Sequence, residues 1–155
     1  MYPTVLLIHS WLRWITLLVA LAATISASRP AVPAPAPLRG RWWDTCFMLA
    51  VDLQVLFGLV LYFGLSPFTT RAMENFRAAW ANPAMRFWAV EHAGVMLVAV
   101  VLLRMGRVLA LNAASPAAGR RRRLICFAIA TLLMIAATPW AGLANGRPFF
   151  RLPAD

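Results

Sequence analysis

Lysine is absent from the 155-residue sequence, acidic residues number only five, and charged residues make up 13% of the chain. Soluble globular domains are about one quarter charged and about half apolar, whereas 62% of this chain is apolar. Such a composition excludes a disordered protein, because disordered segments have few apolar residues. It also argues against a soluble enzyme domain and indicates a membrane protein.

The parts of several familiar active sites are missing as well. Two cysteines, Cys46 and Cys126, are too few for a disulfide framework or a cysteine zinc site. The sequence contains no Gly-rich phosphate-binding loop, no Ser/His/Asp set and no covalent haem-attachment motif. What is left is a chain that is almost entirely membrane-embedded, without an external domain to hold a soluble substrate.

All 15 basic residues are arginine, and the net charge is +10. In a soluble chain, such a charge would indicate nucleic-acid binding. Here the arginines lie between apolar runs of membrane-spanning length. We therefore interpret them as a signal of membrane topology and expect no nucleic-acid partner.

Four stretches have the composition of membrane spans, which need about 20 mostly apolar residues. They cover residues 4–27, 46–65, 87–111 and 124–143. The runs do not alternate apolar and polar residues as barrel strands do. We therefore predict an all-α polytopic membrane protein, a single domain over residues 1–155 built as a four-transmembrane-helix up-down bundle. The first stretch is not interpreted as a cleaved signal peptide, because it lacks a basic leader and contains His9 and Arg13.

Two of the connecting segments have a distinct character. Residues 28–41 are rich in proline and predict a stiff connector. In the longest loop, residues 66–86, the side chains of Met73, Phe76 and Trp80 have the spacing of one helical face. We expect this amphipathic loop to lie on the membrane surface and to cap the bundle.

The distribution of arginine predicts the orientation in the membrane, because arginines concentrate on cytoplasmic loops. In this chain the first and third connecting loops hold most of them: Arg29, Arg39, Arg41 and Arg120 to Arg123, with Arg104 and Arg107 just inside the third span. We therefore expect both termini to face away from the cytoplasm.

The sequence has two histidines, His9 and His92, each about five residues inside a predicted span. At about 1.5 Å per residue, both lie about 7 to 8 Å below the same membrane surface. The first and third spans of an up-down bundle run in the same direction, so the two imidazoles can meet at one depth across the bundle. This arrangement suits a haem held between helices, with one imidazole on each face of the iron.

Two interpretations of the histidines remain open. Small residues lie at helical spacing from each histidine, among them Ala20 and Ala23 after His9 and Ala99 after His92. Small faces leave room for a flat ring, but they also allow direct helix packing in which each histidine forms an interhelical hydrogen bond. Zinc or copper fits less well than haem, because no third ligand of the right type is expected at that depth.

Ionisable residues within membrane spans are functional candidates. Arg13 lies one turn below the first histidine, and Glu91 adjoins the second. We expect an interhelical ion pair between Arg13 and Glu91, with tuning of a nearby cofactor as the alternative. Asp52 in the second span and Arg104 in the third approach each other from the same side, and we expect them to pair as well.

The carboxylates of a haem usually turn toward the aqueous side, and Arg13 lies deeper than the histidines. Arg86, Arg147 and Arg151 are nearer that surface, so we expect these three arginines to bind the propionates. They complete the candidate cofactor site, in which His9 and His92 are the axial ligands.

Four segments of the chain resemble a known group of proteins. The first span contains IHSWLRW, GLVLYFGLSP closes the second, RFWAVEHAGVML opens the third, and PW ends the fourth. In this order and spacing they are similar to a family of small bacterial membrane proteins with four spans, many of them labelled "cytochrome B". The resemblance extends from His9 to Trp140. It implies a b-type haem at the two histidine motifs and a bacterial membrane protein. Together with the arginine distribution, it leads us to expect a location in the bacterial inner membrane with both termini periplasmic.

These features predict a membrane b-type cytochrome-like protein that passes single electrons, with a quinone as a candidate partner. The alternative is a non-catalytic accessory subunit of a larger respiratory or photosynthetic membrane complex, without a cofactor. Its support is the small membrane-embedded chain and the tail NGRPFFRLPAD, because aromatic residues and arginine are enriched at protein interfaces. In that case the tail docks on a partner, whereas the competing expectation is that it folds over its own bundle.

Overall fold

The computed structural model describes residues 1–30 and 39–151, and within these ranges it contains helices and no strand. The long helices are α1 (Tyr2–Ser28), α2 (Arg39–Val60), α6 (His92–Leu111) and α7 (Pro116–Ala136). Between α2 and α6 lie the short helices α3 (Pro67–Glu74), α4 (Phe76–Ala81) and α5 (Pro83–Arg86). Two π-helical segments, η1 (Leu61–Leu65) and η2 (Phe87–Glu91), extend α2 and precede α6. The predicted all-helical class is confirmed, while most of the proline-rich connector lies outside the described residues.

Local sequence signals set the ends of several helices. Pro116 occupies the first turn of α7, and the hydroxyl of Ser115 accepts a hydrogen bond from the backbone N–H of Ala118 at 3.2 Å. Asn75 and Asn82 cap α4 and α5 in the same way. These caps satisfy backbone donors that a helix start leaves unpaired.

Among the described residues, three helical stretches are long and apolar enough to cross a membrane: Tyr2–Ser28, Trp42–Leu65 and Pro83–Leu111. The second and third of them run through the π-helical segments without a break. Large apolar side chains are exposed along all three, among them Leu18, Leu56 and Val101. Because a membrane protein turns such side chains toward lipid, these faces suit contact with a bilayer.

The fourth predicted span, residues 124–143, is not among these stretches. Helix α7 ends at Ala136, and its last arginine is Arg123, so its apolar part rises only about 20 Å at 1.5 Å per residue. Pro139 explains the early end, because the residue before a proline is disfavoured in the helical conformation. The hydroxyl of Thr138 donates a hydrogen bond back to the carbonyl of Met134 at 2.7 Å, which closes the helix.

The long helices pack through a core of small and aromatic side chains. Helix α1 packs on α2 and α7, and α6 packs mainly on α7. Phe47 of α2 and Phe127 of α7 are fully buried and meet edge to face, with ring centroids 5.5 Å apart. At Gly106 of α6, an added Cβ would lie 2.6 Å from the Cβ of Cys126 in α7. Helices α6 and α7 therefore approach more closely there than any larger residue would allow.

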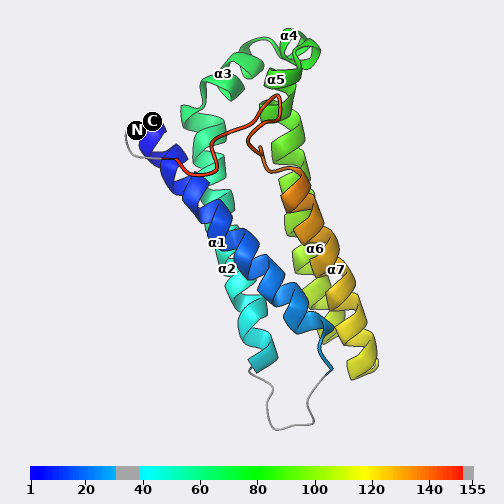
Figure 1. Ribbon diagram of the computed structural model, residues 1–155. Coiled ribbons are helices and arrows are strands. Elements are labelled where there is room, and N and C mark those ends of the chain that lie inside the picture. Colours follow the sequence, from blue (N-terminus) through cyan, green and yellow to red (C-terminus); the bar gives the residue numbers. More distant parts are fainter. Residues whose placement is uncertain (31–38, 152–155) are drawn as a thin grey trace.

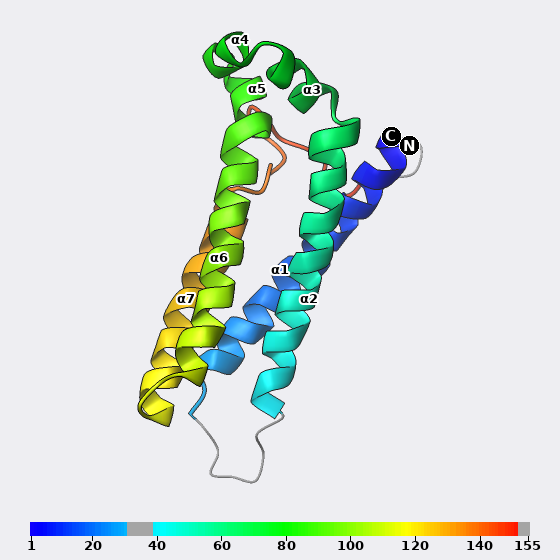
Figure 2. The same cartoon turned by 180° about the vertical axis from the view of Figure 1, so that it is seen from behind.

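The start of α1, the short helices α3–α5 and the start of α6 lie at one end of the bundle. Helix α7 runs toward this end, and the chain after it returns to α1 there (Figures 1 and 2). That returning segment passes between the α1–α2 pair and α6. The π-helical segments η1 and η2 lie at the same end. Such segments are frequent at functional sites, which makes this end of the bundle the candidate location of one.

The short helices α3–α5 cover this end of the bundle, as the amphipathic pattern of residues 66–86 predicted. Ala72 and Ala79 pack beneath them against Ala89 of η2. Met73, Phe76 and Trp80 turn outward and are all more than half exposed. Their position on the membrane surface remains a prediction.

Candidate functional site

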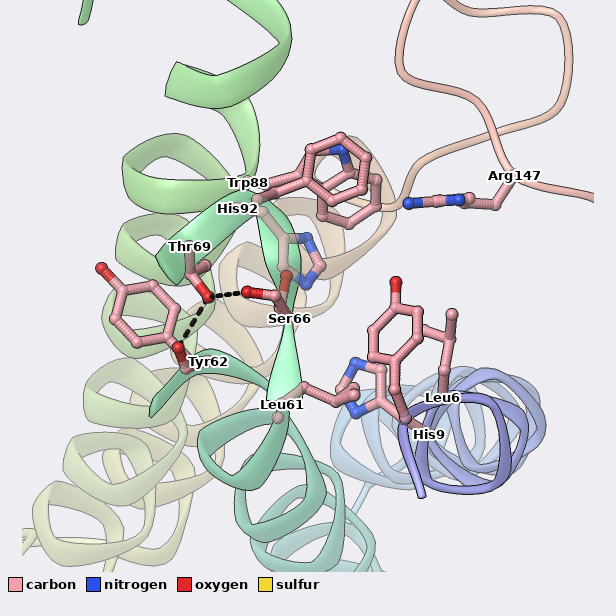
Figure 3. Close-up of a pocket in the computed structure, with 12 residues that line it drawn as sticks. Leu6, His9, Leu61, Tyr62, Ser66, Thr69, Trp88, His92 and Arg147 are labelled. Atoms are coloured by element: carbon pink, nitrogen blue, oxygen red, sulfur yellow. Dashed lines mark hydrogen bonds between the residues drawn. The ribbon is translucent and has the colours of Figure 1, made fainter. Parts of the chain in front are cut away.

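A pocket lies at this end between α1, the junction of α2 with η1, the junction of η2 with α6, and the returning tail (Figure 3). Its cavity volume is about 80 Å³, and the cavity opens to the surroundings. Its walls are mainly apolar and aromatic, and they include Leu6, Leu61, Tyr62, Phe68 and Trp88. Its polar lining includes His9, His92 and Arg147. The lining, mostly apolar with a few polar groups, is typical of a small-molecule or cofactor site.

His92 begins α6 and is held by the end of α7. Its Nδ1 lies 2.8 Å from the carbonyl oxygen of Ala137, the residue that caps the C-terminal end of α7. A carbonyl can only accept, so Nδ1 carries the hydrogen and donates it. The second nitrogen, Nε2, therefore keeps its lone pair, and it has no hydrogen-bond partner among the described residues.

His9 projects from α1 toward α2 and is contacted there by Gln54. The Gln54 amide nitrogen lies 3.3 Å from Nε2 of His9 and 3.2 Å from its backbone carbonyl. Nδ1 of His9 is buried without a hydrogen-bond partner. One turn beyond Gln54, a Cβ added at Gly58 would lie 3.3 Å from Cε1 of the imidazole. The ring thus rests against the bare backbone of α2.

The two histidines therefore line one pocket from two different helices, α1 and α6, which run in the same direction (Figures 1 and 3). The sequence predicted this meeting from their equal distances to the span starts. The ring of His92 packs beside Phe87 and Trp88, with centroid distances of 5.9 and 5.7 Å. Aromatic packing and the Ala137 hydrogen bond hold this imidazole from two sides.

Arg147 comes into the pocket from the returning tail. Its guanidinium carbon lies 4.9 Å from the centre of the Trp88 ring and 5.5 Å from that of Phe68. It forms no ion pair within the described part of the chain, and its Nε is buried without a partner. The stacked rings hold a cationic group with free donors beside the histidines.

A tight turn sets the position of Arg147. Its backbone N–H donates to the carbonyl of Pro139 at 3.0 Å. At Gly146, a Cβ would lie 2.5 Å from the carbonyl oxygen of Trp140, so no larger residue fits without a shift of the backbone. The turn returns the chain to the level at which α7 ended.

The other two arginines expected near a cofactor do not line the pocket. The Nε of Arg86 lies 2.7 Å from Oε1 of Glu91. Arg151 meets the bundle through its backbone, because its carbonyl accepts a hydrogen bond from Nε1 of Trp11 at 3.0 Å. Of the three candidates, only Arg147 lies with the histidines.

The expected ion pair between Arg13 and Glu91 was wrong. Glu91 pairs with Arg86, because the π-helical turn η2 places residues five apart on the same side. Arg13 donates to the carbonyl of Phe149 at 3.1 Å and stacks over Trp14. The tail passes over α1 beside Arg13, and its backbone therefore provides the hydrogen-bond acceptor for the guanidinium.

The expected pair of Asp52 and Arg104 is present between α2 and α6. The sequence offered no indication of a second interhelical pair, in which Nη1 of Arg123 lies 3.1 Å from the buried carboxylate of Asp44. It also gave no indication that Ala137 would be the partner of His92, although the Thr138–Pro139 step could have marked the helix end. Both contacts join residues far apart in the chain, which no local pattern specifies.

Within residues 1–30 and 39–151, no group of three or more His, Cys, Asp or Glu side chains is close enough to hold a metal ion. No protein-family model, curated protein or solved structure matches this chain. Its function is therefore argued from the pocket itself.

Proposed function

We propose that the protein is a membrane b-type cytochrome-like electron carrier, with haem b held between His9 and His92. The observation that carries this proposal is the pair of imidazoles lining one pocket from opposite helices. Two protein ligands suffice for a haem, because the porphyrin supplies the other ligands of the iron. A bare metal ion would need further protein ligands.

The hydrogen bonding of His92 would suit it as a ligand of a haem iron. Metal-bound histidines commonly donate their other N–H to a backbone carbonyl, which fixes the ring and its tautomer. The Nδ1 of His92 makes this bond with Ala137, which leaves Nε2 available. The 3.3 Å contact between Gln54 and His9 is long for a hydrogen bond, so His9 can exchange it for a ligand.

Arg147 would serve as the propionate partner in this site. It lines the same pocket, has no acidic partner among the described residues, and keeps a buried Nε without a hydrogen bond. A carboxylate is the natural partner of such a guanidinium. Arg86 is a weaker candidate, because its guanidinium already forms an ion pair with Glu91.

When bound, haem would supply one-electron redox chemistry, with a membrane quinone as a candidate partner. The residues of the chain would hold the iron through His9 and His92, orient His92 through Ala137, and exclude water with Leu6 and Leu61. The positive charge of Arg147 would stabilise the bound propionates.

The proposal includes the topology. The chain would cross the bacterial inner membrane four times, with both termini and the pocket on the periplasmic side. Support comes from Arg104, Arg107 and Arg120 to Arg123, which belong to the opposite end of the bundle. Single cysteines introduced as Glu74→Cys and Ala118→Cys in a cysteine-free background test the topology. Residue 74 should be labelled from outside and residue 118 only from the cytoplasm, and the reverse pattern would reject the orientation.

A haem spectrum tests the site. Protein purified after expression with ample haem should give a reduced-minus-oxidised spectrum of a b-type cytochrome, and His9→Gly or His92→Gly should abolish it. Added imidazole should restore absorbance to the glycine variants, because it can occupy the space of the lost side chain. Imidazole rescue separates loss of a ligand from loss of the fold. A colourless wild-type protein would reject the proposal.

The accessory-subunit alternative relied on a tail that is free to dock on a partner. In the structure, Phe149 and Phe150 pack against Trp14 of α1, with ring centroids 6.3 and 5.8 Å away. The tail backbone also accepts hydrogen bonds from Trp11 and Arg13. These contacts occupy the tail within its own bundle and make the alternative the weaker one.

A further inference from the structure

Two arginines of α6 converge on α2 at the end of the bundle opposite the pocket. Nη1 of Arg104 lies 3.6 Å from the sulfur of Met48, and Nη1 of Arg107 lies 3.5 Å from the same sulfur. The two nitrogens are therefore within about 7 Å of each other. Two like charges at this separation repel, and a thioether is a weak acceptor that cannot neutralise them.

The acidic residues at this end leave one of the two charges uncompensated. Among the residues that the structure describes, Asp52 forms an ion pair with Arg104 only. The carboxylate of Asp44 lies with Arg123 of α7. Within the part of the chain that the structure describes, Arg107 takes part in no ion pair. The converging guanidinium groups thus keep a net positive charge.

The ion pair of Arg104 with Asp52, next to Arg107, lies on the outer face of the bundle among apolar side chains. The side chains of Arg104 and Asp52 are 48% and 50% exposed. Large apolar side chains next to them along α2 and α6 are also exposed: Leu49, Leu53, Met105 and Val108. Both helices belong to stretches able to cross a membrane, so the charged groups stand on a face that meets lipid.

Both arginines lie near the C-terminal end of α6, at a depth from which they can reach the membrane surface. Arg107 and Arg104 lie four and seven residues before the end of α6 at Leu111, or about 6 and 10 Å along the axis. Long arginine side chains reach the headgroup layer from such depths while their apolar stems stay in the hydrocarbon. The anion that is available at this level of a bilayer is a lipid phosphate.

We infer that Arg104 and Arg107 form a binding site for the phosphate of an anionic phospholipid, against Met48 of α2. The free phosphate oxygens would accept hydrogen bonds from both guanidinium groups. The acyl chains would lie along the exposed leucines of α2. Arg121 and Arg122 at the start of α7 are exposed nearby and add a longer-range attraction for a negative headgroup.

Retention of lipid by the purified protein tests the site. The protein is reconstituted with phosphatidylglycerol or phosphatidylcholine, washed in detergent, and its bound lipid is counted by native mass spectrometry. The wild type should retain phosphatidylglycerol in preference to phosphatidylcholine, and Arg107→Gln should lower that retention about fivefold. Arg107 is chosen over Arg104 because its replacement breaks no ion pair of the described residues. Arg121→Gln removes the same charge from the same end and should have a much smaller effect.

A second readout is the rise in thermal stability on adding phosphatidylglycerol, which should be present in the wild type and lost in Arg107→Gln. Equal losses in Arg107→Gln and Arg121→Gln would show only a general attraction of the basic end and overturn the site. Unchanged retention in Arg107→Gln would overturn it as well. Displacement of the lipid by excess inorganic phosphate, with the same dependence on Arg107, would identify free phosphate as the ligand and reject the lipid.

Discussion

The two ends of the bundle are built on opposite principles. At the end covered by α3–α5, a pocket lined by His9 and Arg147 lies between the helices. At the other end, the backbones of α6 and α7 meet closely at Gly106, and Asp44 forms a buried pair with Arg123. Close packing supplies stability, whereas a pocket forgoes the contacts that would fill it. The comparison indicates that one end stabilises the fold and the other is kept available for a ligand.

The largest effect on stability is expected at the buried ion pair. Asp44→Asn leaves Arg123 without its charge partner, at a site where the side chains are 7% and 17% exposed. Removing one partner of a buried pair costs about 3–5 kcal/mol. Thermal unfolding in detergent should show this loss. The matched variant Glu91→Gln at the pocket end breaks an exposed pair and should cost about 0–1 kcal/mol. Equal losses in the two variants would remove the difference between the ends.

Glycine substitutions in α6 sharpen the comparison. Gly106→Ala forces its Cβ against Cys126 at 2.6 Å, and overpacking of this kind costs about 1–3 kcal/mol. Gly94→Ala in the same helix meets no atom within 4 Å and should leave stability unchanged or raise it by up to about 1 kcal/mol. Denaturation of both variants by a chaotrope measures the difference. A neutral Gly106→Ala would mean that the close approach of α6 and α7 is not needed.

At the pocket end, the expected effect falls on binding and not on stability. Arg147→Gln removes the guanidinium beside the histidines and should weaken haem retention about tenfold, the loss of about one charged hydrogen bond. Arg151→Gln, four residues further along the tail and outside the pocket, is the control. Haem titration of the apoprotein measures both affinities. Identical affinities for Arg147→Gln and the wild type would exclude Arg147 as the propionate partner.

The smallest effect concerns the attachment of the tail. Trp14→Phe keeps the aromatic ring but removes the hydrogen bond from Nε1 to the carbonyl of Phe149 at 2.8 Å. The loss of about 1 kcal/mol should speed cleavage of the tail by trypsin after Arg151, whereas the bond after Arg147 resists trypsin because Pro148 follows it. The exposed Trp80 of α4 provides the control as Trp80→Phe. Equal cleavage rates in the two variants would show that this bond does not hold the tail.

The main features of the fold could be predicted from apolar runs, because the membrane-spanning requirement is local in sequence. The equal distances of His9 and His92 from the span starts were enough to bring both to one pocket. The pairing of Asp52 with Arg104 followed from the same estimate of depth. Such estimates succeed because a regular helix converts sequence position directly into depth.

The predictions that were wrong, the partner of Glu91 and the end of the fourth span, share one cause, which is irregular backbone. The π-turn η2 redirected Glu91 to Arg86, and the Thr138–Pro139 step ended α7 before the predicted boundary. Neither the return of the tail over α1 nor the entry of Arg147 into the pocket follows from a periodic pattern. The resemblance to the "cytochrome B" family, the haem and the orientation in the membrane stay predictions.

Electron paramagnetic resonance of the oxidised, haem-loaded protein tests the central claim most directly, because the spin state of ferric haem reports its axial ligands. Ligation by His9 and His92 together predicts a low-spin signal in the wild type. His9→Gly and His92→Gly should each give a high-spin or haem-free protein, with the low-spin signal restored by imidazole. A wild-type protein that binds no haem, or a low-spin signal that survives in both variants, would contradict the account.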